Sequence, residues 1–285
     1  MTQPSQFCSV DQLKTRIQHD QVKVLDCSWY LPSQSINAEN EFEQRRIPGA
    51  QFFHIDLICD QDSNLPHMLP SADSFSKAAA NLGVSNDSHI VVYDSAGLFS
   101  AARVWWTFKV FGHQNVQVLD GGLPAWEEQG GAIESNTTTA RKTDRVINYV
   151  ATLNNELVIS KQELIENITS KQYQVIDARS EGRFWGLAPE PRAGLPSGHM
   201  PESVSMCYAG LIENGRLKSP QKLQAMFDTV GITRSSNIVT SCGSGVTAAI
   251  LTLALVECGY GFNRLYDGSW SEWALADDTV ILNRG

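Results

Sequence analysis

The chain has 285 residues, of which 42% are hydrophobic and 19% charged. These are the values of a globular protein, and the length allows roughly two domains with buried cores. Its 31 acidic residues outnumber its 22 basic ones, and the formal net charge is −9. That balance argues against nucleic acid or an anionic membrane surface as a general partner, because both are bound through an excess of Lys and Arg.

The N-terminal twenty residues carry Asp11 and Asp20 and lack the apolar segment of a signal peptide. The most apolar run, residues 246–256, is far shorter than the ~20 residues of a membrane span. Six scattered cysteines form no C-x-x-C pair, so neither a zinc site nor a disulfide framework is indicated. We therefore expect a cytoplasmic protein with reduced thiols and no membrane partner.

In the first half of the chain, capping signals and apolar runs predict alternating helices and strands. Ser9 begins a capping-box helix, and Ser71 precedes a helix that ends near Gly83. The predicted strands are Val22–Asp26, His89–Tyr93 and a run at Val118 and Leu119, the last followed by Asp-Gly-Gly and Trp126.

The second half repeats this order about 150 residues later, which indicates a duplicated domain. Ser160 and Ser219 precede the corresponding helices, and the corresponding strands are Tyr173–Asp177, Asn237–Ser241 and a run at Leu265 and Tyr266, followed by Asp-Gly-Ser and Trp273. Alternating strands and helices predict two α/β domains, each a mainly parallel sheet flanked by helices. We place the domains at 1–140 and 158–285, with a linker over 141–157.

The loop after the predicted strand Asn237–Ser241 is the first candidate site, because α/β sheets bind ligands where strands give way to helix N-termini. It reads Cys242-Gly243-Ser244-Gly245-Val246-Thr247. Its glycines allow the backbone to curl around the sulfur with N–H groups pointing inward, and the positive end of the next helix favours the ionised thiol. Cys242 is therefore the candidate nucleophile.

The alternative is that Cys242 is simply a small buried residue at a strand end, as lone cysteines often are. The repeat favours function, because the equivalent position in the first half is Asp94. This difference suggests one active domain and one supporting domain.

The duplicated halves, the single Cys loop and the D-G-x-x-x-x-W endings together resemble the two-domain rhodanese-like sulfurtransferases over nearly the whole chain. The loop is similar to that of the members that use 3-mercaptopyruvate, whereas members that use thiosulfate typically carry Arg and Lys after the cysteine. A neutral loop suits a donor whose charge lies farther from the sulfur, on a carboxylate. Glu202 stands where the family motif usually has Gly, so we expect a different backbone turn there.

The resemblance also implies a donor-binding pair. Arg183, in Glu181–Gly186, and Arg192, in Glu190–Gly194, match two family motifs whose arginines grip the carboxylate and keto oxygen of the donor. A guanidinium can hold a carboxylate through two parallel hydrogen bonds. Without the resemblance, simple ion pairs with Glu181 or Glu190 would be the preferred interpretation.

By the same resemblance, Asp56 and His67 from the first half would join Ser244 in a proton relay beside the thiol. Attack by Cys242 on the donor sulfur expels a pyruvate enolate, which must gain a proton. The alternative is a surface loop with incidental His and Asp residues, because the spacing alone does not link the three.

The resemblance therefore implies a transferase that moves sulfur from 3-mercaptopyruvate through a Cys242 persulfide to a thiol, a thioredoxin-like protein or cyanide. The N–H groups of Gly243, Gly245, Val246 and Thr247 would stabilise the anionic sulfur. No metal or organic cofactor is implied. Thiosulfate remains the alternative donor, and a catalytically silent binding scaffold the alternative class. A phosphatase of this fold would need Arg where this chain has Ala248.

Overall fold

A computed structural model describes residues 5–19, 21–135 and 147–284. The chain forms two compact units, which are described separately. Residues 141–146 of the expected linker lie outside the described residues. Unit 1 comprises Met1–Gln61, Leu69–Leu153 and Asn214–Arg216, and unit 2 comprises Asp62–Met68, Asn154–Glu213 and Leu217–Gly285.

Unit 1 is built on a five-stranded, wholly parallel sheet in the order β1-β5-β4-β2-β3. Parallel neighbours need crossover connections, and helices supply most of them. The strands are β1 (Phe7–Cys8), β2 (Val22–Asp26), β3 (Gln51–Phe52), β4 (His89–Tyr93) and β5 (Val116–Leu119). The helices are α1 (Val10–Arg16), the 3₁₀ turn η1 (Pro32–Gln34), α2 (Ala38–Gln44), α3 (Ala72–Asn81), α4 (Ala101–Val110) and α5 (Gly122–Glu128).

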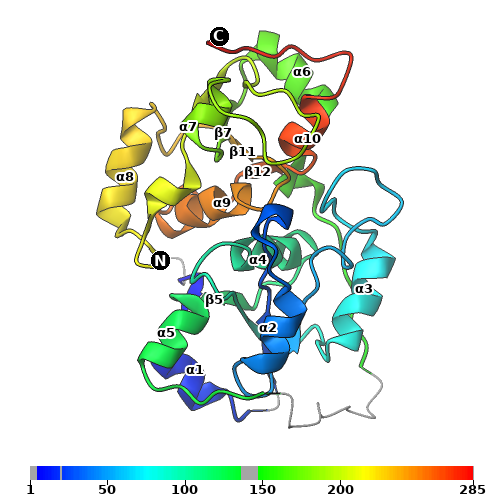
Figure 1. Cartoon of the computed structure of the whole chain (residues 1–285), viewed down its shortest axis with the longest axis vertical. Helices are drawn as coiled ribbons and strands as arrows, with labels where there is room; N and C mark the ends of the chain where they lie inside the picture. The colour runs from blue at the N-terminus through cyan, green and yellow to red at the C-terminus, as the bar shows by residue number, and fades with distance from the viewer. Residues whose placement is uncertain (1–4, 20, 136–146, 285) are drawn as a thin grey trace. The chain divides into compact units, whose positions relative to one another are not determined.

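Helices cover both faces of the unit 1 sheet. On one face, Leu13 of α1 and Trp126 of α5 pack with Val91 and Tyr93 of β4, and Figure 1 shows α1 and α5 close together. Phe75 of α3 belongs to a separate group of packed aromatic rings. The centre of its ring lies 4.3 Å from the centre of the ring of Phe111, the residue that caps the end of α4. Because successive strand residues point to opposite faces, a strand covered on both sides is apolar throughout, as β4 is after its first residue.

Unit 2 repeats the plan, with a parallel sheet in the order β6-β12-β11-β7-β8 and a separate pair of short strands, β9 and β10. Its strands are β6 (Val158–Ile159), β7 (Gln174–Asp177), β8 (Ser203–Ser205), β9 (Ile212–Glu213), β10 (Arg216–Leu217, of which Arg216 is grouped with unit 1), β11 (Ile238–Ser241) and β12 (Arg264–Tyr266). Its helices are η2 (Asn155–Leu157), α6 (Lys161–Ser170), α7 (Glu181–Phe184), η3 (Tyr208–Leu211), α8 (Pro220–Thr229), α9 (Ala248–Glu257) and α10 (Ser269–Trp273).

The core of unit 2 places α9 directly behind the Cys242 loop. Nearly every side chain of α9 is buried, and Figure 1 shows α8 beside it. Trp270 and Trp273 of α10 pack with Val239 of β11 in another hydrophobic group. The loop after β11 thus lies between two packed helices, α9 and α10. This packing fixes the position of Cys242, the first residue of the loop.

The predicted fold class is confirmed, as are both predicted capping boxes. Ser9 and Ser160 each accept a hydrogen bond from the third helical residue, whose side chain accepts from the cap's own N–H. The expectation of a different turn at Glu202 is wrong. Glu202 has φ +59° and the equivalent Gly49 has φ +75°, so both adopt the left-handed turn, with a glutamate in place of the residue that favours it.

The described part of the chain contains no helix that is both long and apolar enough to cross a membrane.

Candidate active site

The Cys242 loop lies at the carboxyl end of β11 and leads into α9. Cys242 is only 2% exposed, and Gly245 has φ +76°, which turns the backbone back toward the helix. The thiol therefore occupies a protected position in the loop that leads into an apolar helix.

The segment before and within α10 holds this loop by hydrogen bonds. The N–H groups of Trp270 and Ser271 donate to the carbonyl oxygens of Cys242 and Gly243, at 2.9 and 3.0 Å. Ser269 accepts from the N–H of Cys242 at 3.2 Å and from the N–H of Gly245 at 3.1 Å. The Gly245 N–H therefore bonds to a hydroxyl, instead of facing the sulfur as expected.

The equivalent loop in unit 1 shows how this fold uses its backbone donors. The Asp94 carboxylate accepts from the N–H groups of Ala96 at 3.0 Å, Phe99 at 2.7 Å and Ala101 at 2.8 Å. The loop thus curls around the side chain of its first residue. Burial raises the Asp94 pKa, while the same backbone N–H groups act in the opposite direction. In unit 1 the anion that these donors surround belongs to the protein itself.

Two guanidinium groups reach the Cys242 loop. A Cβ atom added at Gly243 would lie 3.0 Å from Nη2 of Arg183 and 3.9 Å from Nη1 of Arg192. The structure therefore brings together Gly243, the neighbour of the candidate nucleophile, and both arginines that the sequence singled out. Gly243 leaves room for the guanidinium groups because it has no side chain.

Arg183 belongs to a network of ion pairs whose other members are buried. Glu190, with a side chain only 1% exposed, accepts from Arg183 at 2.5 and 3.0 Å and from Arg179 at 2.7 Å. Arg179 also binds both carboxylate oxygens of Asp177, and its guanidinium lies 4.0 Å from the centre of a Trp270 ring. The ion pair between Arg183 and Glu190, which was the alternative to donor binding, exists, but it is part of a buried network and not a solvated loop contact.

His67 and Ser244 also lie together, within unit 2. Nδ1 of His67 is 3.1 Å from Oγ of Ser244, and both residues are buried. His67 comes from the first half of the sequence, but the segment Asp62–Met68 belongs to unit 2. The family resemblance pointed to the pair of His67 and Ser244, but the sequence did not predict that His67 lies in unit 2.

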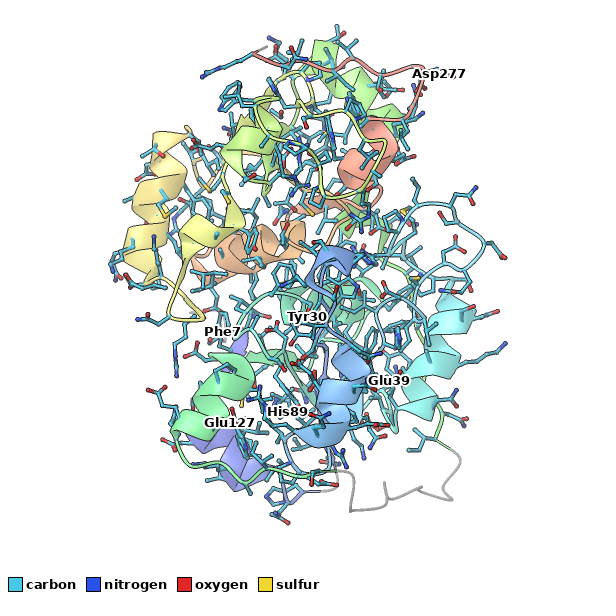
Figure 2. All side chains as sticks on the ribbon, viewed as in Figure 1. Phe7, Tyr30, Glu39, His89, Glu127 and Asp277 are labelled. Carbon is cyan, nitrogen blue, oxygen red and sulfur yellow. The ribbon has the colours of Figure 1, made fainter. Side chains whose placement is uncertain are left out.

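Asp56 belongs to unit 1, where its carboxylate accepts from the indole N–H of Trp29 at 3.0 and 3.1 Å. It borders a pocket of about 190 Å³ that the residues after β2 and β3 line. Tyr30 and Glu39, labelled in Figure 2, are also part of that lining.

Three residues near the site were not among the sequence candidates: Ser269, Glu190 and Tyr208. Burial raises the pKa of Tyr208, the charges of Cys207 and Cys242 act in the same direction, and Arg183 opposes them. The phenol is therefore influenced by the charges of both Cys242 and Arg183. Two of them had a detectable signal: Ser269 interrupts the repeated Asp-Gly-Gly with a hydroxyl, and Glu190 was already an alternative ion-pair partner of Arg183.

The family model for the rhodanese-like domain matches the chain twice, at residues 9–129 and 160–276. A 3-mercaptopyruvate sulfurtransferase from Rattus norvegicus is 42% identical over 96% of this chain and 93% of the relative. A thiosulfate sulfurtransferase from the same organism is 43% identical over 88% of this chain and 84% of the relative.

A solved structure is also similar to this chain. The 3-mercaptopyruvate sulfotransferase SseA from Escherichia coli superposes with a TM-score of 0.83 and 34% identity, covering 94% of this chain and 99% of that one. The repeated α/β units, the cysteine loop in the second unit and these similarities lead to one conclusion: the chain belongs to the rhodanese-like family of sulfurtransferases and contains two rhodanese-like domains.

Proposed function

We propose that this chain transfers sulfur from 3-mercaptopyruvate to a thiol acceptor through a persulfide on Cys242. The observation that carries the proposal is the position of Arg183 and Arg192 against Gly243, next to the nucleophile. A three-carbon keto acid can span that arrangement, with its carboxylate on a guanidinium and its sulfur toward Cys242.

In the first step, the Cys242 thiolate attacks the sulfur of the donor and forms the S–S bond of the persulfide. The carbon–sulfur bond breaks, and its electron pair remains on carbon as the enolate of pyruvate. Protonation of that carbon gives pyruvate, which leaves before the acceptor reacts. No external oxidant or reductant is needed, because the two electrons lost by the sulfur atoms as the S–S bond forms are taken up by the carbon that becomes the methyl group of pyruvate.

We assign the anion-stabilising role to the N–H groups of Gly243, Ser244, Val246 and Thr247. The arrangement around Asp94 supports this role, because an equivalent loop of the same chain directs its N–H groups toward its first side chain. Preorganised donors of this kind stabilise developing negative charge without further rearrangement.

The proton would come through Ser244 and His67, whose 3.1 Å separation allows transfer between hydroxyl and imidazole. We propose Asp56 as the third member of this relay. The Asp56→Asn variant tests that role. This substitution should lower kcat with 3-mercaptopyruvate. It should not change the rate at which iodoacetamide alkylates the free Cys242 thiol.

In the second step, an acceptor thiolate attacks the outer persulfide sulfur, and Cys242 leaves as a thiolate. We propose a small thiol or a thioredoxin-like protein as the acceptor, with cyanide as a laboratory substitute. A reducing cytoplasm, the location expected from the sequence, would supply such thiols. Release of sulfide from the isolated persulfide by thioredoxin and by dithiothreitol would compare the two acceptor classes.

The decisive experiment is a mass measurement of the chain after incubation with 3-mercaptopyruvate. The wild-type chain should gain one sulfur atom, and peptide mapping should locate it on Cys242. Cys242→Ser should gain none, whereas Cys207→Ser, which removes the least buried cysteine of unit 2, should behave like the wild type. Full sulfur transfer by Cys242→Ser would refute the assignment, and a catalytically silent scaffold would show no added sulfur at all.

Thiosulfate is the competing donor. The absence of a side chain at position 243 favours the keto acid, since the loop carries no cation for a dianion that is charged beside its sulfur. We expect kcat/KM at least about tenfold higher for 3-mercaptopyruvate than for thiosulfate. The reverse order would identify a thiosulfate sulfurtransferase on the same fold.

A further inference from the structure

The repeat contains one position where both units adopt a left-handed backbone but use different residues. Gly122 in unit 1 has φ +57°, and the equivalent Ser269 in unit 2 has φ +50°. Both precede a residue whose N–H binds the carbonyl oxygen of the first loop residue: Leu123 donates to Asp94, and Trp270 to Cys242. The two positions therefore perform the same backbone task.

Serine is unfavourable at a position that needs only a left-handed backbone conformation. A side chain is unfavourable in the left-handed region, where glycine is the ordinary residue. In unit 1 a Cβ at Gly122 would also clash with the backbone of the Asp94 loop. Unit 2 nevertheless accommodates a fully buried serine here, and strained residues of this kind are concentrated at functional sites.

The Ser269 hydroxyl makes three hydrogen bonds that account for its presence. It donates to the carbonyl oxygen of Tyr266 at 2.8 Å, and it accepts from the N–H groups of Cys242 and Gly245. One donor and two acceptor positions are the full capacity of a hydroxyl group. Ser269 thus ties the first and fourth residues of the Cys242 loop to one point on the neighbouring segment.

We propose that Ser269 is a positioning residue that sets the curvature of the Cys242 loop and thereby the ionisation of its thiol. By binding the N–H groups of Cys242 and Gly245, it leaves the other loop N–H groups to converge on the sulfur. Its action is indirect, since its oxygen contacts the backbone and not the substrate. This inference rests on the proposed role of Cys242 as the sulfur carrier.

The test uses Ser269→Gly in the full chain, because glycine keeps the left-handed backbone and removes only the hydroxyl. The rate of Cys242 alkylation by iodoacetamide is followed from pH 5 to pH 9.5 by mass spectrometry of the Cys242 peptide. We expect the rate at pH 7 to fall about tenfold, with an unchanged plateau at high pH, because the thiolate is less stabilised but equally accessible. The value of kcat with 3-mercaptopyruvate should fall at least about tenfold, while KM stays close to that of the wild type.

Ser88→Ala is the matched control. Ser88 is a buried serine of unit 1 whose hydroxyl accepts from the N–H of Ser85 at 2.9 Å. Its loss should leave the alkylation profile unchanged while reporting the effect of removing a buried hydroxyl on urea unfolding. Ser269→Ala provides a second variant, which keeps a Cβ in the strained conformation and should unfold more readily than Ser269→Gly while showing the same alkylation defect.

An alkylation profile of folded Ser269→Gly or Ser269→Ala that superposes on the wild-type profile would overturn the proposal. The result is separable from the proposed function, because alkylation requires no sulfur donor. If the wild-type chain formed no persulfide with 3-mercaptopyruvate, the sulfur-transfer assignment would fail, and the dependence of thiol ionisation on Ser269 would still be measured.

Discussion

Glu190 illustrates, at the scale of single residues, how one carboxylate can hold two guanidinium groups with different tasks. Arg179 is fully buried between Asp177 and Glu190, whereas the side chain of Arg183 is 22% exposed and reaches toward Gly243. The inner arginine anchors Glu190, and Glu190 then fixes the outer arginine in one orientation. A preorganised guanidinium loses less freedom on binding a carboxylate, so we expect this network to favour binding of the donor that Arg183 is proposed to hold.

Glu190→Gln tests this arrangement. The amide keeps the size of the side chain but removes the charge, so Arg183 is less firmly oriented. We expect KM for 3-mercaptopyruvate to rise about tenfold, with a smaller change in kcat. Urea unfolding should show a loss of roughly 3 kcal/mol, because the buried Arg179 loses half of its compensation. Glu181→Gln is the control, because Glu181 lies in the same short helix α7 as Arg183, and an equal rise of KM there would argue against the network.

Gly243→Ala tests why position 243 lacks a side chain. The new methyl group would lie 3.0 Å from Nη2 of Arg183, so the guanidinium must move away from the loop. We expect kcat/KM for 3-mercaptopyruvate to fall about tenfold and kcat/KM for thiosulfate to change much less. The ratio of the two kcat/KM values, 3-mercaptopyruvate over thiosulfate, should therefore decrease. Gly210→Ala is the control, because the nearest atom to its added Cβ is a flexible methionine methyl at 3.5 Å. An unchanged donor ratio for Gly243→Ala would contradict the steric explanation.

At the scale of elements, local signals were sufficient where a helix is defined by its own first turn. Ser9 and Ser160 were predicted as helix caps, and the structure confirms both, because a capping box involves residues only three apart. Glu202 shows the opposite case. Its identity predicted a different turn, yet the left-handed conformation is kept, because the surrounding fold overrides the preference of one side chain.

Ser160→Ala measures how much one of these caps contributes. Ser160 Oγ accepts from the N–H of Glu163 at 3.3 Å, and Glu163 accepts in return from the N–H of Ser160 at 2.9 Å. Loss of the hydroxyl should reduce the free energy of unfolding by about 1 kcal/mol. The helix α6 lies outside the candidate site, so kcat/KM should not change. A loss of activity at unchanged stability would mean that α6 has a role beyond support.

For the whole molecule, the sequence predicted two repeated units and the three central strands of each five-stranded sheet, because hydrophobic period and duplication extend over many residues. It could not predict that residues 62–68 belong to unit 2, or that Asp177, Arg179, Glu190 and Arg183 form one buried network. Both features depend on contacts between separated segments, which no local pattern encodes. The candidate residues beyond the cysteine loop were therefore available only through the family resemblance.

The stability of unit 1 should depend on pH through the buried carboxyl group of Asp26. Burial raises the pKa of Asp26 from 3.8 to about 6, despite hydrogen bonds from the Ser28 N–H and hydroxyl at 2.9 and 2.6 Å. Because the folded state holds this proton more tightly than the unfolded state, the contribution of Asp26 to stability is fully present below about pH 4. It is lost as the pH rises through 6, by up to about 3 kcal/mol.

Asp26→Asn removes this titration, since the amide resembles the protonated acid and can still accept from Ser28. The difference in free energy of unfolding between variant and wild type should therefore shift in favour of the variant, by up to about 3 kcal/mol, between pH 4 and pH 7.5. Urea unfolding at several pH values measures it. Asp87→Asn, at an exposed position of unit 1, should show no such shift. If the difference for Asp26→Asn stayed constant with pH, the buried carboxyl would not be protonated in the folded protein under mildly acidic conditions, and the contribution assigned to its burial would be wrong.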